Sequence, residues 1–221
     1  MSLYTFSQKD QLPEMILPEG LTFEESTDIT LLSNLGDITR QEIVNRFAND
    51  HLAFVAFMRG KAAAFGWMAR GKALIGEIDH ELVLPVANRY LWNFRTLPEF
   101  RGLGIYPALL QFIIRYEKKG EHFWIIHAPE NKSSMRGIVK AGFEYVGKLY
   151  TDSEGMAALD ANDLSKDHRY LLGEMDIRLS YDTAASCWNC SSPYIKNRKA
   201  ECCCATEAEE CRGRFHGDVV G

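Results

Sequence analysis

The chain has 221 residues, of which 46% are hydrophobic and 11% aromatic, a composition that suits one globular domain with a sizeable core and a small appendage. Its formal net charge of -5 argues against a protein that coats nucleic acid or an anionic membrane over its whole surface. No apolar run reaches the roughly 18 residues of a membrane helix, and the first residues lack a signal-peptide profile, so we expect a cytoplasmic protein without a membrane partner.

Strand-like segments dominate the first hundred residues. The expected strands cover residues 21–27, 51–60, 61–71, 72–85 and 87–96. Between the second and third of them, residues 59–61 have the composition of a hairpin turn. The segment after the first strand has Ile38, Ile43, Val44 and Phe47 at the spacing of an amphipathic helix. This part of the chain therefore predicts a meander with one helical insertion.

The following residues alternate helices with strands. Helical spacing begins at Ile105, and a second helix over 131–142 is expected to be capped by Asn131 and stopped by Gly142. The expected strands cover residues 122–129, 143–150 and 169–179, with a polar stretch at 151–168. The order predicts an α/β domain over residues 1–182, with a mixed sheet flanked by helices.

The stretch PEFRGLGIYPALL, residues 98–110, predicts an anion-binding turn. Gly102 and Gly104 let the backbone turn tightly and bring its N–H groups close to a ligand. The first turn of the following helix leaves N–H groups unpaired at the positive end of its dipole, and Pro107 fits an early helical position. Arg101 would add a fixed charge or brace the loop. The arrangement suits a pyrophosphate, and an ordinary strand-to-helix turn with a solvated arginine is the alternative.

This stretch resembles the signature of the GCN5-related N-acetyltransferase (GNAT) superfamily: arginine or glutamine, two residues, glycine, one residue, then glycine or alanine. Here it reads Arg101-Gly102-Leu103-Gly104-Ile105-Tyr106. About 30 residues on, the family usually has asparagine, alanine, leucine–tyrosine and glycine–phenylalanine, and this chain has Asn131, Ser134, Gly137-Ile138 and Gly142-Phe143. The resemblance spans residues 20–180 in element order. It implies a GNAT-like fold and an N-acetyltransferase that moves an acetyl (acyl) group from acetyl-CoA, or another acyl-CoA, to a primary amine of a small molecule or a protein.

The resemblance also implies which residues bind the coenzyme. Backbone groups of Thr96 and Leu97 would pair with the pantetheine arm, and Asn131 and Ser134 would lie against it. The pyrophosphate would be held by the turn itself, through Arg101, Gly102, Leu103, Gly104, Ile105 and Tyr106. Two residues depart from the family pattern. Tyr106 replaces a small residue, and its ring is expected at the mouth of the phosphate cradle; Ile138 stands where many members have a tyrosine that protonates the leaving thiolate.

Direct attack of the amine on the thioester is the mechanism that the resemblance implies, with backbone N–H groups of the strand at 87–96 stabilising the oxyanion. A base must first remove a proton from the ammonium group. The candidates are His127, at the end of a strand, and Glu77, His80 and Glu81, before the strand at 87–96. Each has an ordinary alternative, a surface charge for a glutamate and a packed or capping ring for a histidine. The acid is left open between Tyr106 and Tyr145.

All six cysteines lie after residue 186, where we expect a separate Cys-rich tail over residues 185–221. Cys187 and Cys190 have the two-residue gap of a zinc knuckle. We expect one structural zinc ion, with His216 as a substitute ligand, and the expected ligands are Cys187, Cys190, Cys211 and one of Cys202, Cys203 and Cys204. A tail without structure, an iron–sulfur cluster and a thiol–disulfide pair remain alternatives. The tail has as many acidic as basic residues, so we expect it to contact a protein and not nucleic acid.

A second function stays open at this point. Isoleucine cannot donate a proton, so Ile138 is compatible with an acyl-CoA-binding, zinc-ribbon-bearing adaptor that has little or no catalytic turnover. The acceptor amine, the acyl chain and the oligomeric state are not defined by the sequence.

Overall fold

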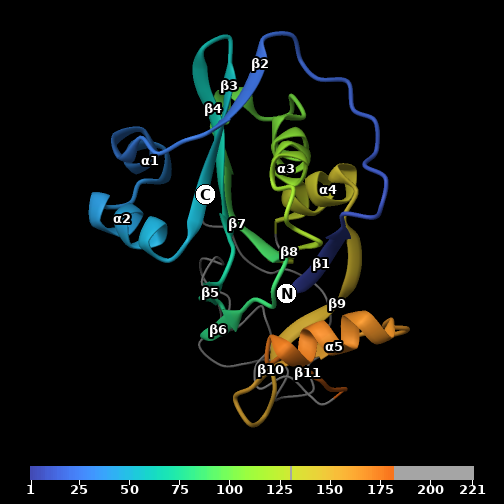
Figure 1. Cartoon of the computed structure of the whole chain (residues 1–221). Coiled ribbons are helices and arrows are strands. Elements are labelled where there is room, and N and C mark those ends of the chain that lie inside the picture. The colour runs from blue at the N-terminus through green and yellow to red at the C-terminus, as the bar shows by residue number, and fades with distance from the viewer. Residues whose placement is uncertain (130, 182–221) are drawn as a thin grey trace, which may run out of the picture.

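A computed structural model describes residues 1–129 and 131–181, which form one large mixed sheet covered on both faces (Figure 1). The strand order across this sheet is β11-β10-β9-β1-β8-β7-β4-β3-β2. Its strands are β1 (Ser2–Ser7), β2 (Leu21–Glu25), β3 (His51–Met58), β4 (Lys61–Ala69), β7 (Asn88–Thr96), β8 (His122–His127), β9 (Glu144–Thr151), β10 (Ala157–Asp160) and β11 (Arg178–Leu179). The pairs β7–β8 and β10–β11 are parallel, and the other neighbours are antiparallel.

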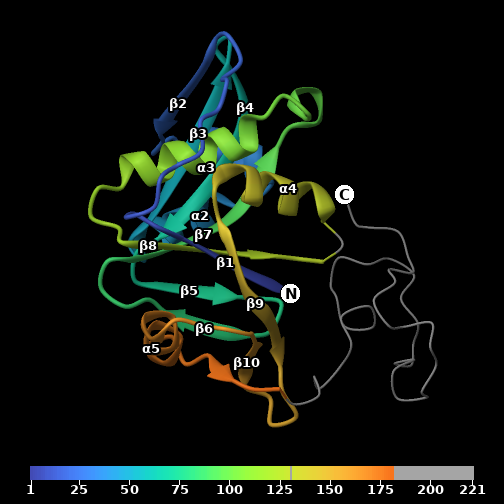
Figure 2. The ribbon, with the colours of Figure 1, turned by 90° about the vertical axis from the view of Figure 1, so that its right-hand side faces the viewer.

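Helices and a small hairpin cover the sheet (Figures 1 and 2). The helical elements are α1 (Ile29–Gly36), α2 (Arg40–Ala48), the short 3-10 turn Pro98–Phe100, α3 (Ile105–Tyr116), α4 (Lys132–Ala141) and α5 (Lys166–Glu174). The hairpin pairs β5 (Lys72–Ile75) with β6 (His80–Val83). One face of the sheet packs against α3 and α4. The opposite face packs against α1 and α2 at one end, and against the hairpin and α5 at the other.

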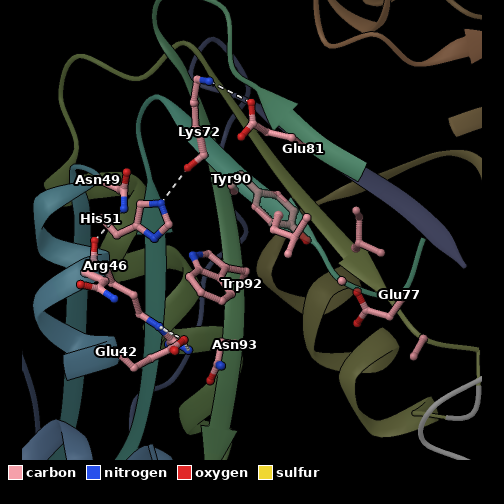
Figure 3. Close-up of a pocket in the computed structure, with 16 residues that line it drawn as sticks. Glu42, Arg46, Asn49, His51, Lys72, Glu77, Glu81, Tyr90, Trp92 and Asn93 are labelled. Carbon is pink, nitrogen blue, oxygen red and sulfur yellow. Dashed lines mark hydrogen bonds and ion pairs between the residues drawn. The ribbon is translucent and has the colours of Figure 1, made fainter. Parts of the chain in front are cut away.

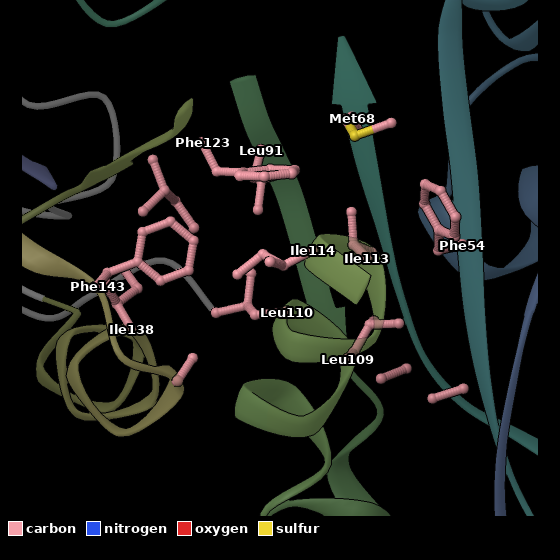
Figure 4. Packing of buried hydrophobic residues seen from close by; sticks show 14 of the residues in the cluster. Phe54, Met68, Leu91, Leu109, Leu110, Ile113, Ile114, Phe123, Ile138 and Phe143 are labelled. Atoms are coloured by element: carbon pink, nitrogen blue, oxygen red, sulfur yellow. The ribbon is translucent and has the colours of Figure 1, made fainter. Parts of the chain in front are cut away.

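Helix α3 lies on the sheet along an apolar stripe (Figure 4). Its Ile105, Leu109 and Ile113 recur every four residues and are fully buried, in one cluster with Phe54 and Met68 of β3 and β4. Each buried side chain of this kind contributes about 1.5–3 kcal/mol relative to leaving it exposed. The packing fixes the start of α3, and with it the turn that joins β7 to this helix.

Strands β7 and β8 pair over only part of their length. Asn88–Leu91 of β7 pairs with His122–Ile125 of β8, whereas β7 continues to Thr96 along β4 on its other side. A bulge interrupts the β4–β7 pairing between Phe65 and Trp67, and Asn93 at this point of β7 has a φ of 52°. Strands β7 and β8 therefore separate beyond Leu91. The bulge changes the direction of the β7 side chains at this point of separation.

Several expectations from the sequence are confirmed. The turn between β3 and β4 has φ values of 50° at Arg59 and 78° at Gly60, the conformation that a two-residue hairpin requires. Helix α4 is capped by the Asn131 side chain, which accepts a hydrogen bond from the Ser134 N–H, and it ends at Gly142 with a φ of 105°. The mixed sheet flanked by helices is present as expected.

The expected strand at 169–179 is wrong, because most of this segment belongs to helix α5. Ser165 caps the helix by accepting a hydrogen bond from the His168 N–H, and Leu172 and Met175 are buried at helical spacing. Only Arg178 and Leu179 form a strand, β11, beside β10. Strand β10 itself lies in the stretch that the sequence presented as polar.

The N-terminal strand β1 was not expected from the sequence. It lies between β8 and β9 and is antiparallel to both, so its partners are more than 100 residues away along the chain. Leu3 and Phe6 are buried on opposite faces of the sheet, in two different core clusters. A short apolar run acquires such a position only through its distant partners, which a local pattern does not contain.

The helical segment before β3 divides into two helices. Asp37 ends α1 with a φ of 53°, and the Thr39 side chain starts α2 by accepting from the Glu42 N–H. Ile43 is fully buried as expected, whereas Val44 is exposed. The division orients α2 so that one of its sides faces strands β3 and β7.

Candidate functional site

A cavity of about 620 Å³ lies where β7 and β8 separate (Figure 3). Helix α2 and the start of β3 form one wall, and the β5–β6 hairpin forms the other. Trp92 and Asn93 of β7, with Ile126 and Ala128 at the end of β8, line it at the point of separation. This volume falls in the range of small-molecule binding sites. The cavity opens on the face of the sheet opposite to α3 and α4.

Charged side chains line both walls of the cavity. On α2, the Arg46 Nη2 donates to Glu42 Oε1 at 3.0 Å. On the hairpin, the Lys72 Nζ donates to Glu81 Oε1 at 2.8 Å (Figure 3). Glu77, on the turn between β5 and β6, adds a third carboxylate. The lining therefore holds three carboxylates and two cations, and both cations bond to carboxylates of the lining itself.

Arg46 is held between two indole rings under this cavity. Its guanidinium carbon lies 4.4 Å from the Trp92 ring centroid and 4.9 Å from that of Trp67. The side chain is 9% exposed, and burial lowers the Arg46 pKa despite the opposing effect of Glu42. Arg46 is thus covered by aromatic rings and points most of its surface away from the solvent in the cavity.

His51, the first residue of β3, is another buried polar residue of the lining. Its Nε2 lies 2.7 Å from the Lys72 carbonyl oxygen, and because a carbonyl only accepts, Nε2 carries the proton. Nδ1 then has a bare lone pair, and no hydrogen-bond partner for it exists within the described residues. Burial lowers the His51 pKa, with the nearby Arg46 acting in the same direction and the Lys72 carbonyl and Asp50 acting against it. His51 is therefore neutral near pH 7.

On the other face of the sheet, the turn from β7 into α3 forms the glycine-rich cradle expected from the sequence. Gly102 and Gly104 have φ values of 80° and 76°, which favour glycine. A side chain at Gly102 would meet no atom within 4 Å, and α3 has no side-chain cap at its start. The space beside Gly102 is therefore open, and no side chain caps the first turn of α3.

Two cationic residues flank this cradle. The Arg101 Nε donates to the Thr96 carbonyl oxygen at 3.2 Å, so Arg101 braces the turn against the end of β7. Lys140 of α4 lies on the other side, with its Nζ 3.9 Å from the place that a Cβ on Gly104 would occupy. Sequence reasoning missed Lys140, because only the packing of α4 beside α3 brings it to the turn.

Tyr106 does not lie at the mouth of the cradle, contrary to the expectation. Its ring packs inward against Phe94 and against the backbone of Gly137 in α4, where a Cβ would collide with it. The hydroxyl lies 3.3 Å from the Ser134 Oγ, and burial raises the pKa of Tyr106 well above its usual value. The glycine in α4 makes the space that the ring fills, which explains how a large residue is accommodated at this position.

The other expected coenzyme residues lie around the same turn. Leu97 donates its N–H to the Ala63 carbonyl, so it faces β4, and Thr96 precedes it at the end of β7. Asn131 uses its side-chain oxygen to cap α4, and accepts there from Ser133 and Ser134. Leu103 is half exposed at the tip of the turn. The structure thus brings all these residues to one end of β7, between the starts of α3 and α4.

The candidate bases do not gather in one place. Among them, Glu77 and Glu81 line the cavity. His127 is buried, with its Nε2 2.9 Å from the Asn131 carbonyl and its ring edge toward Tyr4, and the cavity lining includes its neighbours Ile126 and Ala128 but not His127. His80 lies outside the lining, with its Nε2 3.0 Å from the Met175 carbonyl. His51 was missed because it carries no motif of its own.

The expected zinc ligands, Cys187, Cys190, Cys202, Cys203, Cys204, Cys211 and His216, lie outside the described residues. Within residues 1–129 and 131–181, no group of three or more His, Cys, Asp or Glu side chains could hold a metal ion. In the same part of the chain, no helix combines the length and the apolar character needed to cross a membrane.

No protein-family model and no curated protein sequence matches the chain. Similar solved structures include a GCN5-related N-acetyltransferase from Kribbella flavida, with 15% identity and a TM-score of 0.44 over 65% of this chain and 53% of that one. The ribosomal-protein-S18-alanine N-acetyltransferase from Escherichia coli is 18% identical, with a TM-score of 0.46 over 60% of this chain and 82% of that one. An aminoglycoside acetyltransferase from an uncultured soil sample, in complex with sisomicin, is 11% identical, with a TM-score of 0.44 over 56% of this chain and 88% of that one. The match spans about half the length of the Kribbella protein.

Proposed function

We propose that the protein is an N-acyltransferase that moves an acetyl or other acyl group from its CoA thioester to a primary amine. The observation that carries this proposal is the placement of two half-sites on opposite faces of one gap in the sheet. The glycine cradle lies at the end of β7 on the α3 face, and the polar cavity lies on the other face, where β7 and β8 separate. A donor and an acceptor bound in these two places would meet through the gap.

The residues of the donor half-site fit a pyrophosphate. Helix α3 has 12 residues and no side-chain cap at its start, so its first-turn N–H groups are available to an anion, and the space beside Gly102 is open. Lys140 adds a positive charge beside the turn, and Arg101 fixes the loop geometry. When bound, acyl-CoA supplies a thioester as the acyl donor. The chain's part is to hold the phosphates with backbone groups and to leave the free edge of β7 open beside the gap.

A second function, coenzyme binding without turnover, has one observation in its favour. Ile138 is fully buried in the cluster that includes Leu110 and Phe143, so this position of α4 offers no proton donor to the site. In the transferase that we propose, water or another group protonates the leaving thiolate.

For the Cys-rich tail we keep the hypothesis of a separate unit over residues 185–221 that binds one zinc ion, after an acyltransferase domain over residues 1–182. The spacing of Cys187 and Cys190 supports it. Metal analysis of the full chain purified without added zinc tests it. About one zinc per chain, reduced by Cys187→Ser, is expected, and substoichiometric metal would contradict the hypothesis.

The transferase proposal is tested with the full chain by two measurements on the same preparation. Calorimetry is expected to detect binding of acetyl-CoA, and thiol release from acetyl-CoA is expected with at least one amine of a panel of alkylamines, diamines, amino sugars and peptides. Binding without release on any amine would favour the adaptor. Neither binding nor release would overturn the donor half-site as well.

A further inference from the structure

The ring of Tyr106 lies between two elements on different sides of the gap. On one side is Phe94, in the part of β7 that has separated from β8, with the two ring centroids 5.4 Å apart. On the other side is Gly137 of α4, where a Cβ would collide with the Tyr106 ring. The Tyr106 hydroxyl lies 3.3 Å from the Ser134 Oγ, also of α4. The ring therefore joins the free half of β7 to α4 on the α3 face of the sheet.

The proposed transfer defines both ends of the route that a bound acyl-CoA would take. Its pyrophosphate would lie at the turn before α3, which includes the N–H group of Tyr106 itself, and its thioester would lie in the gap beside Asn93. The pantetheine arm joins these two groups. The Tyr106 ring starts at the first place and reaches Phe94, the chain neighbour of Asn93, so it occupies the line between them. The ring and the arm cannot fill this space together, because protein interiors are close-packed.

The opening between the two half-sites is covered by a side chain and not by the sheet. The pairing of β7 with β8 stops at Leu91, so the backbone does not separate the half-sites beyond this residue. The lining of the cavity on the opposite face includes Trp92 and Asn93, and among the residues that the structure describes it has none from α3 or α4. The Tyr106 ring covers the opening on the α3 face, and it can move without breaking strand pairing.

The position of Tyr106 in α3 leaves its side chain free to change rotamer. Within a helix, the preceding turn blocks one of the three χ1 positions for most residues. Tyr106 is the second residue of α3, and the residues three and four places before it, Leu103 and Gly102, belong to the turn. The hydroxyl contact with Ser134 joins two neutral groups at 3.3 Å, which makes it a weak hydrogen bond. The ring is therefore held in place lightly at its polar end.

From this geometry we propose that Tyr106 is a gate on the route of the donor. In the chain without coenzyme, its ring closes the space between β7 and α4, and the Ser134 hydroxyl holds it there. The ring turns away when the pantetheine arm enters. Tyr106 thereby limits the rate and the affinity with which the chain binds acyl-CoA. This inference rests on the proposed acyl transfer, and it adds a control on the uptake of the donor.

Two ligands that differ by the arm test the gate with the full chain. ADP has an adenosine and a diphosphate, as acetyl-CoA has, but no arm beyond the diphosphate. Tyr106→Ala is expected to raise the association rate constant of acetyl-CoA at least about tenfold in stopped-flow measurements and to lower its Kd, because an open state no longer has to form first. The Kd of ADP is expected to stay within about twofold. Tyr170→Ala, which removes an exposed ring from α5, is the control.

Two results would overturn the gate. The first is unchanged or slower association of acetyl-CoA with Tyr106→Ala, in a variant whose folded state is verified by thermal unfolding; slower association would mean that the ring is a contact of the coenzyme. The second is an equal gain in affinity for ADP, because a ring that obstructs only the cradle would hinder both ligands alike.

Smaller changes keep the gate testable if Tyr106→Ala does not fold. Tyr106→Phe and Ser134→Ala each remove one side of the hydroxyl contact and leave the other side chain in place. Each is expected to raise the association rate constant of acetyl-CoA about two- to threefold. The double variant is expected to gain no more than either single variant, because the same hydrogen bond is lost. Wild-type rates in all three variants would overturn the gate.

These outcomes separate the gate from the proposed function. If the wild-type chain and Tyr106→Ala bind acetyl-CoA at the same rate, the coenzyme site is kept and the gate is lost. If Tyr106→Ala binds acetyl-CoA faster but releases no thiol with any amine, the gate is kept and the transferase function is lost. If neither chain binds acetyl-CoA, the donor half-site and the gate are both lost.

Discussion

The two half-sites differ in how they are built. The cradle at the start of α3 consists of backbone N–H groups over two glycines, and its geometry follows from a few consecutive residues and the helix behind them. The cavity on the opposite face consists of side chains from α2, β3, the β5–β6 hairpin, β7 and β8, and it exists only when all five are in place. In the transfer that we propose, the backbone cradle would hold the pyrophosphate and the side-chain cavity would hold the acceptor.

Apart from both half-sites, an ion network lies at the C-terminal end of α3, beside the first residues of β7. Glu117, which follows α3, is 3% exposed and accepts hydrogen bonds from Arg70 Nη2 at 2.6 Å and from Arg89 Nη2 at 3.2 Å. Burial raises the Glu117 pKa, but the two guanidinium groups outweigh it, and the pKa lies below its usual value. The network ties the end of α3 to β4 and β7.

The largest expected loss of stability comes from breaking this ion network. Glu117→Gln leaves two guanidinium groups without their carboxylate and is expected to destabilise the protein by about 3–5 kcal/mol. Urea unfolding measures the loss, and Glu121→Gln, a change of an exposed carboxylate nearby, is the control. A loss below about 1 kcal/mol would mean that the network contributes little.

The same network predicts a pH dependence. Because the folded-state pKa of Glu117 is depressed, its contribution is fully present above the unfolded value near 4.5 and disappears as the pH falls through the folded value. The wild-type free energy of unfolding is therefore expected to fall more steeply below pH 4.5 than that of Glu117→Gln. Parallel curves for the two proteins would contradict this assignment.

The next effect concerns the fit of Tyr106 on the cradle side. Gly137→Ala places a Cβ against the Tyr106 ring and is expected to cost about 1–3 kcal/mol by overpacking. Gly173→Ala is the matched control, because this helical glycine of α5 has no atom within 4 Å of a Cβ, and a gain of about 0.5 kcal/mol is expected there. Equal thermal midpoints for the two variants would refute the packing of Tyr106 against α4.

A third change breaks the cradle without touching the cavity. Gly104→Val forces a β-branched residue to a φ of 76° beside the first N–H groups of α3, and the Kd for acetyl-CoA is expected to rise at least about tenfold. Gly155→Val has the same strain, at a φ of 82° in a turn away from both half-sites, and is expected to bind normally. Similar Kd values for acetyl-CoA in the two variants would contradict binding of the coenzyme at the cradle.

The smallest effect concerns charge beside the cradle. Lys140→Gln is expected to raise the KM for acetyl-CoA about two- to fivefold at low salt, with a smaller change at high salt and no change for the amine. Lys166→Gln on α5 is the control for loss of a surface charge. A salt-independent effect would contradict a direct electrostatic role.

The sequence predicts the cradle because its determinants are local. The turn is predicted by Gly102, Gly104 and the helix after them. The caps of α4 at Asn131 and Gly142 are also predicted from neighbouring residues. Tyr106 could not be placed in this way, because the space for its ring comes from Gly137 on another helix.

The cavity and parts of the sheet could not be predicted from local sequence, because they depend on residues from distant elements. His51 and Arg46 become functional candidates only through Lys72 and two indoles that come from other elements. Strand β1 is defined by partners that lie more than 100 residues away along the chain. The apolar residues around Leu172 are compatible with a helix or a strand, and the cap at Ser165 favours the helix.

The most direct test of the central claim is a crystal structure of the full chain with acetyl-CoA and an amine that is methylated at nitrogen to prevent transfer. We expect the pyrophosphate on the Ile105 and Tyr106 N–H groups, the amine between α2 and the β5–β6 hairpin, and the thioester in the gap beside Asn93. A coenzyme bound with its acyl group away from this gap, or an amine bound outside the cavity, would contradict this expectation.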